Sequence, residues 1–389
     1  MGMKTNHFRF LILASAVVTP AWGLDLLMVD SPARLARPAN AFDYTGAVFA
    51  GNDMVLVSHF SDDRWPANYR ARSGTNLAVA NMRVTLGERR GDWSVGYFYR
   101  QDWQLKANRD TVDAHYLDQA GQLVSQARGF DLDYSLRGFA ADGLRLGLSK
   151  AFAAAGGGEW TWGVAASLLH GYDVRVETAR GNLLTTLGSA TLVGNRQLFN
   201  TRLHAVPPSN SFNAFTPAEN QDVSAGWGYA LDFGLAWQLQ NGARLDFAVN
   251  DLLGRIKWNR VPLIEQTING DLAGGSLVPR TTASISGGNR YQSLNLNLKP
   301  KLRIEGGYPL GNTTLTAGAE AVDGQWFPQL AASYRVGSRW RLGLGYETRF
   351  GSVQISLRHP NYFLALSSQN LKLNESRALG LSMGLNYPF

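Results

Sequence analysis

The sequence contains no cysteine among its 389 residues, and only six histidines. Without cysteine the chain can form neither disulfides nor a cysteine-ligated metal site, so its stability must come from packing and hydrogen bonding. No two histidines have the spacing of a helical metal site, and no metal or other cofactor is expected. Lysine and arginine do not cluster, so a nucleic-acid partner is not expected either.

Long apolar runs are rare, and the run near the start, Phe8–Val18, is too short to cross a bilayer as a helix. Lys4 and Arg9 give this region a positive charge, and Ala21–Gly23 offers a cleavage site with two small residues. Residues 1–23 are therefore predicted to be a secretory signal peptide. Export without a membrane-spanning helix leaves the periplasm, the outer membrane or the medium as the destination.

Glycine and aromatic residues are abundant. The chain has 42 glycines and 11% aromatic residues, and its mean hydropathy is −0.17 although 45% of its residues are hydrophobic. Strands with one polar and one apolar face produce such a mixture. The formal charge is +7, of which Lys4 and Arg9 leave with the signal peptide. A moderately basic chain suits either contact with anionic lipid headgroups or a lumen that prefers anions.

The last eleven residues alternate strictly between large apolar and small or polar side chains. The apolar set is Leu379, Leu381, Met383, Leu385, Tyr387 and Phe389, and the other set is Gly380, Ser382, Gly384, Asn386 and Pro388. Because a strand points successive side chains to opposite faces, one face here is wholly apolar. The pattern resembles the closing strand of Gram-negative outer-membrane β-barrels. The resemblance implies contact with outer-membrane lipid, and recognition of Met383, Leu385, Tyr387 and Phe389 by the barrel assembly machinery.

The same alternation recurs along the chain. It is clearest over Trp227–Leu239, which a turn at Gln240–Gly242 joins to a second alternating run from Arg244. About fifteen such candidates are present, and bacterial single-chain barrels have an even number of strands. We therefore predict an all-β fold, an antiparallel transmembrane β-barrel of fourteen to sixteen strands over residues 44–389. A soluble β-sandwich is the main structural alternative, but it would bury the large residues in a core.

The lengths of the gaps between strands predict an orientation. Barrels of this class have short periplasmic turns and longer extracellular loops. With both termini in the periplasm, the two longest gaps, residues 178–224 and 259–290, fall outside the cell. No repeat of fixed period is visible, so a propeller or solenoid is not supported.

Charged residues of both signs share the face opposite to the lipid-facing one. The predicted lumen-lining residues are Arg100, Asp131, Asp133, Arg137, Arg145, Asp173, Arg175, Asp232, Arg244, Asp246, Arg303, Glu305, Glu320, Arg335, Arg341 and Arg358. Two interpretations remain open. The charges either select a solute in a wet interior, or pair with one another and stiffen the wall.

One motif suggests catalysis. Gly380–Gly384 matches the G-x-S-x-G pattern of a nucleophile elbow, but that pattern requires a strand-to-helix turn and here it lies inside the terminal strand. No catalytic residues are predicted, and an outer-membrane barrel enzyme is the third alternative for function.

The segment 24–43 is not an alternating strand, and the face of Trp227–Leu239 that points inward carries mostly glycine and alanine. Small inward residues leave room for water, for an inserted extracellular loop or for this segment. The segment is therefore predicted to remain in the periplasm or to tuck inside as a plug. The layout resembles FadL-like transporters of hydrophobic compounds and the related TraF-like barrels. Their Asn-Pro-Ala motif is absent, since Pro38–Asn40 reads Pro-Ala-Asn, and no binding residues are carried over.

The expected function is porin-like or transporter-like passage of small solutes or hydrophobic compounds across the outer membrane. The main functional alternative is a non-conducting barrel that serves as an envelope assembly or secretion component. Reconstituted protein that conducts ions would distinguish the first from the second.

Overall fold

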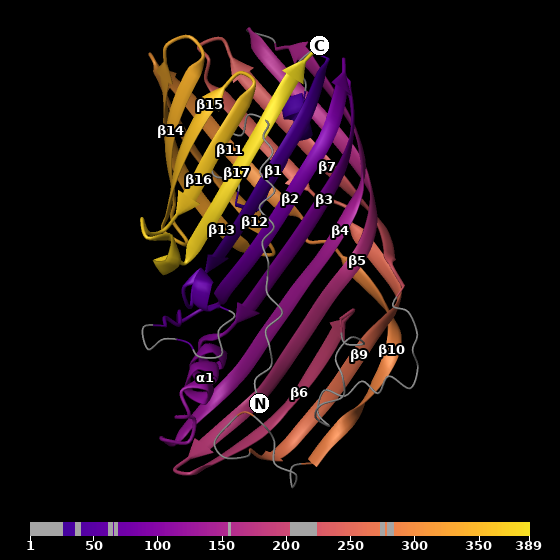
Figure 1. Cartoon of the computed structure of the whole chain (residues 1–389), viewed down its shortest axis with the longest axis vertical. Helices are drawn as coiled ribbons and strands as arrows, with labels where there is room; N and C mark the ends of the chain where they lie inside the picture. Colours follow the sequence, from indigo (N-terminus) through magenta and orange to yellow (C-terminus); the bar gives the residue numbers. More distant parts are fainter. Residues whose placement is uncertain are drawn as a thin grey trace.

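The computed structural model describes residues 26–35, 40–60, 65, 69–154, 157–202, 224–272, 277 and 284–389. The predicted signal peptide, residues 1–23, lies outside the described residues. The strands form one antiparallel sheet that curls into a barrel (Figure 1). Its first strand begins at Ala41, inside the segment 24–43 that was predicted to precede the barrel.

The strands are long and follow one another as hairpins around most of the wall. They are β1 Ala41–Asn52, β2 Asn76–Arg90, β3 Trp93–Ala107, β4 Arg128–Ala153, β5 Gly158–Thr186, β6 Ser189–Asn200, β7 Gly226–Leu239, β8 Arg244–Asn250, β9 Arg255–Asp271, β10 Ser284–Asn297, β11 Lys301–Leu310, β12 Thr313–Val322, β13 Gln325–Val336, β14 Trp340–Glu347, β15 Ser352–His359, β16 Tyr362–Ser368 and β17 Ala378–Pro388. The helical elements are α1 Arg109–Gln119 and the short 3-10 turns η1 Pro32–Leu35, η2 Val57–His59 and η4 Leu373–Glu375.

The barrel closes because β1 pairs with strands from both ends of the chain. Ala41 to Gly51 of β1 lie opposite Pro388 to Ala378 of β17, and the other edge of β1 pairs with β2. Closure satisfies the backbone groups that a free edge would expose to lipid. The prediction of an all-β antiparallel barrel of fourteen to sixteen strands is confirmed.

At three positions around the wall, two strands lie end to end and together fill one place in the barrel. Gly158 to Gly171 of β5 pair with β7, while Arg175 to Thr186 of the same strand pair with β6. Both β6 and β7 also pair with β9, so they occupy successive levels of one position in the wall. In the same way β9 continues the course of β8, and β11 that of β10.

The composite strands make one side of the barrel taller (Figure 1). We call the end that holds Ala41 and Phe389 the terminal end, and the opposite end, where β5 turns into β6, the distal end. Much of the two predicted loops, 178–224 and 259–290, is strand here, in β5, β6, β9 and β10. The alternation signal was weak because polar residues and glycine occupy both faces of these extensions.

The large apolar residues point outward. On three neighbouring strands Leu330, Leu344 and Ile355 are 60%, 58% and 62% exposed, and they follow the outward register of their hairpins. In the closing strand Tyr387 and Phe389 are exposed as well. An apolar outer face against small and polar inner residues is the pattern of a barrel in lipid, and it rules out the sandwich.

A β-bulge at Tyr172 changes the face that the rest of β5 presents. Ala141 lies opposite Gly171, but Ala140 lies opposite Asp173, so Tyr172 is an extra residue. Beyond it, Asp173 and Arg175 lie on the outer face. The prediction that these two side chains line the lumen was wrong, because strict alternation was carried through the bulge.

Helix α1 covers the distal edge of β4, where β3 has already ended. Asn108 caps the helix by accepting a hydrogen bond from the Thr111 amide at 2.9 Å. The Asp131 and Asp133 amides of that edge donate to the side chains of Asp110 and Thr111, so the helix protects an otherwise open edge. No helix among the described residues is long and apolar enough to span a membrane.

Candidate functional site in the lumen

The N-terminal segment, Leu26–Leu35, lies against the inner wall. Leu26, Leu27 and Val29 are almost fully buried and pack with inward residues such as Phe49 and Phe327. Farther along, a Cβ on Gly234 of β7 would lie 2.6 Å from the Ser31 hydroxyl, and one on Gly163 of β5 would lie 2.4 Å from the Pro32 backbone. Residues 31–33 therefore lie directly against the glycines of β5 and β7, which have no side chain there.

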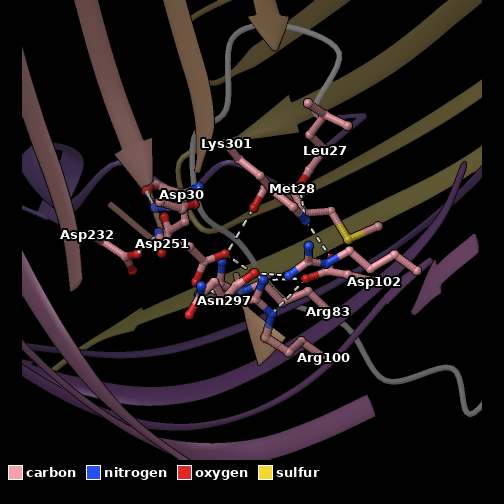
Figure 2. A network of polar contacts seen from close by, with 12 residues as sticks. Leu27, Met28, Asp30, Arg83, Arg100, Asp102, Asp232, Asp251, Asn297 and Lys301 are labelled. Carbon is pink, nitrogen blue, oxygen red and sulfur yellow. Dashed lines mark hydrogen bonds and ion pairs between the residues drawn. The ribbon is translucent and has the colours of Figure 1, made fainter. Parts of the chain in front are cut away.

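Wall side chains bind the backbone of the segment, which belongs to no strand (Figure 2). The Leu27 amide donates to Glu320 Oε2 at 2.8 Å, and the Leu27 carbonyl accepts from Lys301 Nζ at 3.0 Å. Asn81 Nδ2 donates to the Leu26 carbonyl at 3.2 Å, and Arg83 donates to that of Met28. These bonds satisfy buried backbone groups that have no ladder partner.

Asp30 joins the segment to a pair of opposite charges on the wall. Its backbone amide and carbonyl each bond the Asn250 amide group at 2.7 Å. Its carboxylate forms an ion pair with Arg145, and Arg145 also lies 2.8 Å from Asp232. Because Arg145 and Asp232 are both buried, each depends on the other for compensation of its charge.

A second ion-pair group lies beside it. Arg100 binds Asp251 through two hydrogen bonds, of 2.8 and 2.7 Å, and also contacts Asp102. Lys301, which holds the Leu27 carbonyl, forms an ion pair with Asp102. Figure 2 shows these side chains converging on the N-terminal segment from strands on different sides of the barrel. The described contacts favour the interpretation in which lumen charges neutralise one another.

The predicted lumen residues divide into three groups. Arg100, Asp232, Asp246, Arg303, Glu305 and Glu320 are buried in the interior; Arg244 pairs with Asp246 at 2.7 Å, and Arg137 reaches the Asn297 carbonyl from β4. Arg335, Arg341 and Arg358 lie near the terminal end. Asp131 and Asp133 are exposed on the distal part of β4, beyond the end of β3.

Sequence reasoning missed several members of the network. Arg83 and Asp102 have the inward parity of their strands, so the same alternation could have found them. Asp30 and Asp251 lie outside regular strands, where no periodicity applies. No metal-binding group of three or more acidic, histidine or cysteine residues occurs in the described part of the chain.

An apolar cluster covers the inner face toward the distal half of the barrel. We call it the apolar lumen cluster; it comprises Phe98, Phe139, Ala141, Leu169, Val174, Phe199, Ala230, Ile256, Trp258, Val261, Leu263, Leu294, Leu296 and Leu298. Trp258 lies where β6 gives way to β7. A Cβ on Gly171 or on Gly226 would come within 2.5 Å of its ring, so both positions require glycine.

Two small cavities lie beside the described part of the N-terminal segment. One of about 50 Å³ lies between Leu27, Arg100 and Phe139, and another of about 60 Å³ adjoins Met28 and Arg83. A much larger depression of about 830 Å³ is formed mainly by outward residues such as Ala317, Leu330 and Leu344, so it faces the surroundings rather than the lumen.

Several of the solved structures that the chain resembles carry the names of hydrocarbon channels or transporters. A TodX deltaS2S3 mutant monoaromatic hydrocarbon channel matches with 11% identity and a TM-score of 0.49 over 94% of each chain. The Pseudomonas putida toluene transporter TodX gives 10%, 0.42, and 95% of this chain against 93% of that one. The Ralstonia pickettii toluene transporter TbuX gives 11%, 0.34, and 97% against 96%.

No curated protein matches the sequence significantly. A family model does match, over residues 64–358, which covers β2 to β15 and thus most of the barrel wall. The protein, an outer-membrane-type β-barrel, therefore belongs to the family of unknown function DUF5723.

Proposed function

We propose that the protein is a channel for small hydrophobic solutes in the outer membrane, closed in this state by the N-terminal segment. One observation carries the proposal: the apolar lumen cluster lies on the inner face of the wall. A lumen for hydrophilic solutes would be polar there, whereas a concave apolar surface with a few polar groups suits a hydrophobic ligand.

The same proposal includes the division of the chain and its orientation. Residues 1–23 are removed on export, residues 24–40 provide the plug, and the wall begins with β1 at Ala41. The barrel assembly machinery recognises Met383, Leu385, Tyr387 and Phe389. Because it does so from the periplasm, the terminal end lies there. A solute then enters from the tall distal side, contacts the apolar lumen cluster, and passes when the N-terminal segment moves.

Binding of a hydrophobic fluorescent probe, N-phenyl-1-naphthylamine, to the purified protein in nanodiscs tests the role of the cluster. Leu169 points inward and is fully buried, while its neighbour Leu168 points outward and is 55% exposed. We expect Leu169→Asn to weaken saturable probe binding about tenfold, as the loss of roughly 1.4 kcal/mol of apolar contact predicts. Leu168→Asn is the matched control and should bind as the unchanged protein does. Equal effects of both variants would contradict the proposal.

Single-channel conductance tests the plug. Deletion of residues 24–39, which leaves β1 intact, should give a large, steady current where the intact protein is mostly closed, because the backbone bonds to Glu320, Lys301 and Asn81 disappear together. An unchanged current would remove the plug from the proposal. If the deletion variant conducts nothing and the probe does not bind, the non-conducting envelope component becomes the better interpretation.

A further inference from the structure

The apolar outer face of the barrel ends at one level on its tall side. Leu168 of β5 and Leu231 of β7 are exposed to the surroundings, and both lie on the terminal side of this level. Beyond the bulge at Tyr172, the outer face of β5 carries Asp173 and Arg175 instead. A barrel in lipid has an apolar band with aromatic girdles at its two borders. The change from leucine to charged side chains therefore indicates the distal border of the lipid.

A row of directly opposite outward residues follows this border from strand to strand. Its members are Tyr99 of β3, Asp142 of β4, His170 of β5, Trp227 of β7, Lys257 of β9 and Asn295 of β10. Trp227 is 59% exposed, as expected of an aromatic side chain at the level of the lipid headgroups. We call this set the border row.

Two cations lie together on the outer face of β9 at this border. Arg255 and Lys257 are two residues apart, so their side chains point to the same face, about 7 Å from each other along the strand. Both are exposed, whereas Ile256 and Trp258, which alternate with them, are buried in the apolar lumen cluster. Among the described residues neither cationic side chain has an ion pair or a hydrogen bond. We call Arg255 and Lys257 the β9 cations.

The outward carboxylates of the neighbouring strands are engaged with other groups. Asp142 accepts a hydrogen bond from the Tyr97 hydroxyl at 2.6 Å and contacts His170 at 3.0 Å. Asp173 forms an ion pair with Arg202. Strands β5 and β7 lie between β4 and β9 at the border row, so Asp142 is about 14 Å from the β9 cations at the usual strand spacing. Neither carboxylate offsets the charge of the β9 cations by direct contact.

Neutral side chains that suit a lipid headgroup flank the β9 cations. Trp227 and Tyr229 of β7 lie directly opposite them on one side, and Asn295 and Asn297 of β10 lie opposite them on the other. Aromatic rings at this depth contact headgroups. The two asparagines are exposed, and their amide groups can donate to and accept from sugar hydroxyls. The surface therefore offers positive charge to a phosphate and hydrogen bonds to a sugar.

We propose that the β9 cations bind a phosphate of a lipopolysaccharide headgroup, the phosphorylated glucosamine of lipid A, in the leaflet at the distal end. Arginine and lysine bind phosphate oxygens through charge-assisted hydrogen bonds. Their side chains point away from the lumen into the border of the bilayer, so the ligand is a lipid. The choice of lipid rests on the orientation given in the proposed function, because the distal leaflet is then the outer one, which in Gram-negative bacteria consists of lipopolysaccharide.

Native mass spectrometry of the purified full-length protein in dodecyl maltoside, titrated with diphosphoryl lipid A, tests the proposal. We expect saturable binding, with clearly weaker binding of dephosphorylated lipid A and of phosphatidylglycerol. Arg255→Gln and Lys257→Gln should each weaken the binding of diphosphoryl lipid A about fivefold, because a basic residue at an anionic lipid surface contributes roughly that factor. The double variant should weaken it about 25-fold.

Lys150→Gln is the matched control. Lys150 of β4 is also an exposed cation with outward parity, but it lies close to the end of β4 at the terminal end of the barrel. Each variant is first shown to fold by its heat-dependent shift in gel electrophoresis. An equal loss in Lys150→Gln and Lys257→Gln, or equally tight binding of phosphatidylglycerol and diphosphoryl lipid A to the unchanged protein, would overturn the proposal. Probe binding at Leu169 does not require lipid A, so failure of the site and failure of the proposed function are seen separately.

Discussion

At the scale of single residues, alternation along strands predicts which way a side chain points but not which partner it meets. Arg100 and Asp232 are inward, as predicted, and their burial follows from that. Their ion pairs with Asp251 and Arg145 join parts of the chain that are distant in sequence. Those partners depend on the register and curvature of the closed barrel, for which the sequence has no local signal.

Asp30 illustrates a residue whose role only the structure shows, and its removal is predicted to loosen the N-terminal segment. Asp30→Asn abolishes the ion pair with Arg145, while Asp232 still compensates that arginine. Because the Asp30 side chain is 39% exposed, solvent screening limits the loss to about 1 kcal/mol, or roughly a fivefold change in equilibrium.

In single-channel recording of Asp30→Asn, openings should be about five times as frequent, as a loss of about 1 kcal/mol predicts. Asp323→Asn provides the control, since Asp323 pairs with Lys106 and Lys299 and does not contact the segment. If Asp30→Asn opens no more often than Asp323→Asn, the ion pair does not hold the segment.

At the scale of elements, the hairpins of the C-terminal third were predictable because one face of each strand is wholly apolar. The distal extensions of β5, β6, β9 and β10 were not, since polar residues and glycine occupy both faces there. The bulge at Tyr172 was not predicted, for a related reason. One extra residue reverses the parity of the strand, and nothing in the local composition marks it. Gly171 beside the bulge shows how tightly this region packs.

Gly171→Ala is predicted to destabilise the barrel, because the new methyl group would meet the Trp258 ring at 2.5 Å. Overpacking of this kind costs about 1–3 kcal/mol. The urea midpoint of the purified protein should fall. In a Trp258→Ala background, Gly171→Ala should lower the midpoint much less.

Gly306→Ala is the matched control for the backbone effect of losing a strand glycine. A Cβ there has no neighbour closer than 3.9 Å, so we expect almost no change in the urea midpoint. A Gly171→Ala variant as stable as Gly306→Ala would show that the Trp258 ring can move aside freely.

Helix α1 should dock less firmly in acid. His115 contacts the Trp65 ring edge-on, with 4.7 Å between ring centroids, and its burial lowers the pKa of the imidazole despite the opposing charge of Asp118. The undocked helix has an ordinary histidine pKa of about 6.5. Docking is therefore fully favourable above that pH, and is weakened as the pH falls through it because the undocked state takes up the proton first.

Hydrogen exchange of the amides of residues 109–119 measures this effect. Their protection should be constant above pH 7 after correction for intrinsic exchange, and should decrease toward pH 5. In His115→Phe, which keeps the contact between rings but cannot titrate, that decrease should be absent. An unchanged pH dependence in this variant would assign the effect to another group.

At the scale of the whole molecule, the sequence predicted a lipid environment and a barrel topology. It could do so because every strand of a barrel in lipid turns apolar side chains outward. From the small inward residues of β7, the sequence left open what enters the lumen: water, an extracellular loop or the segment before β1. Closure itself depends on a contact between the two ends of the chain. That contact is the ladder between β1 and β17, together with the side chains that span it at the terminal end.

Asp43 connects three strands across this seam and is predicted to be needed for a stable closed barrel. It lies on β1, accepts hydrogen bonds from Arg89 of β2 and, at 2.6 Å, from Asn386 of β17, and is almost fully buried with Arg89. Asp43→Ala leaves that arginine buried without its partner, which costs about 3–5 kcal/mol. The temperature at which the folded band disappears in heat-modifiability electrophoresis should fall clearly.

Glu88→Ala removes an exposed ion pair with Arg90 at the same end and should leave that temperature unchanged, because exposed pairs contribute at most about 1 kcal/mol. If the two variants melt together, the ladder alone closes the barrel and the buried ion pair is dispensable.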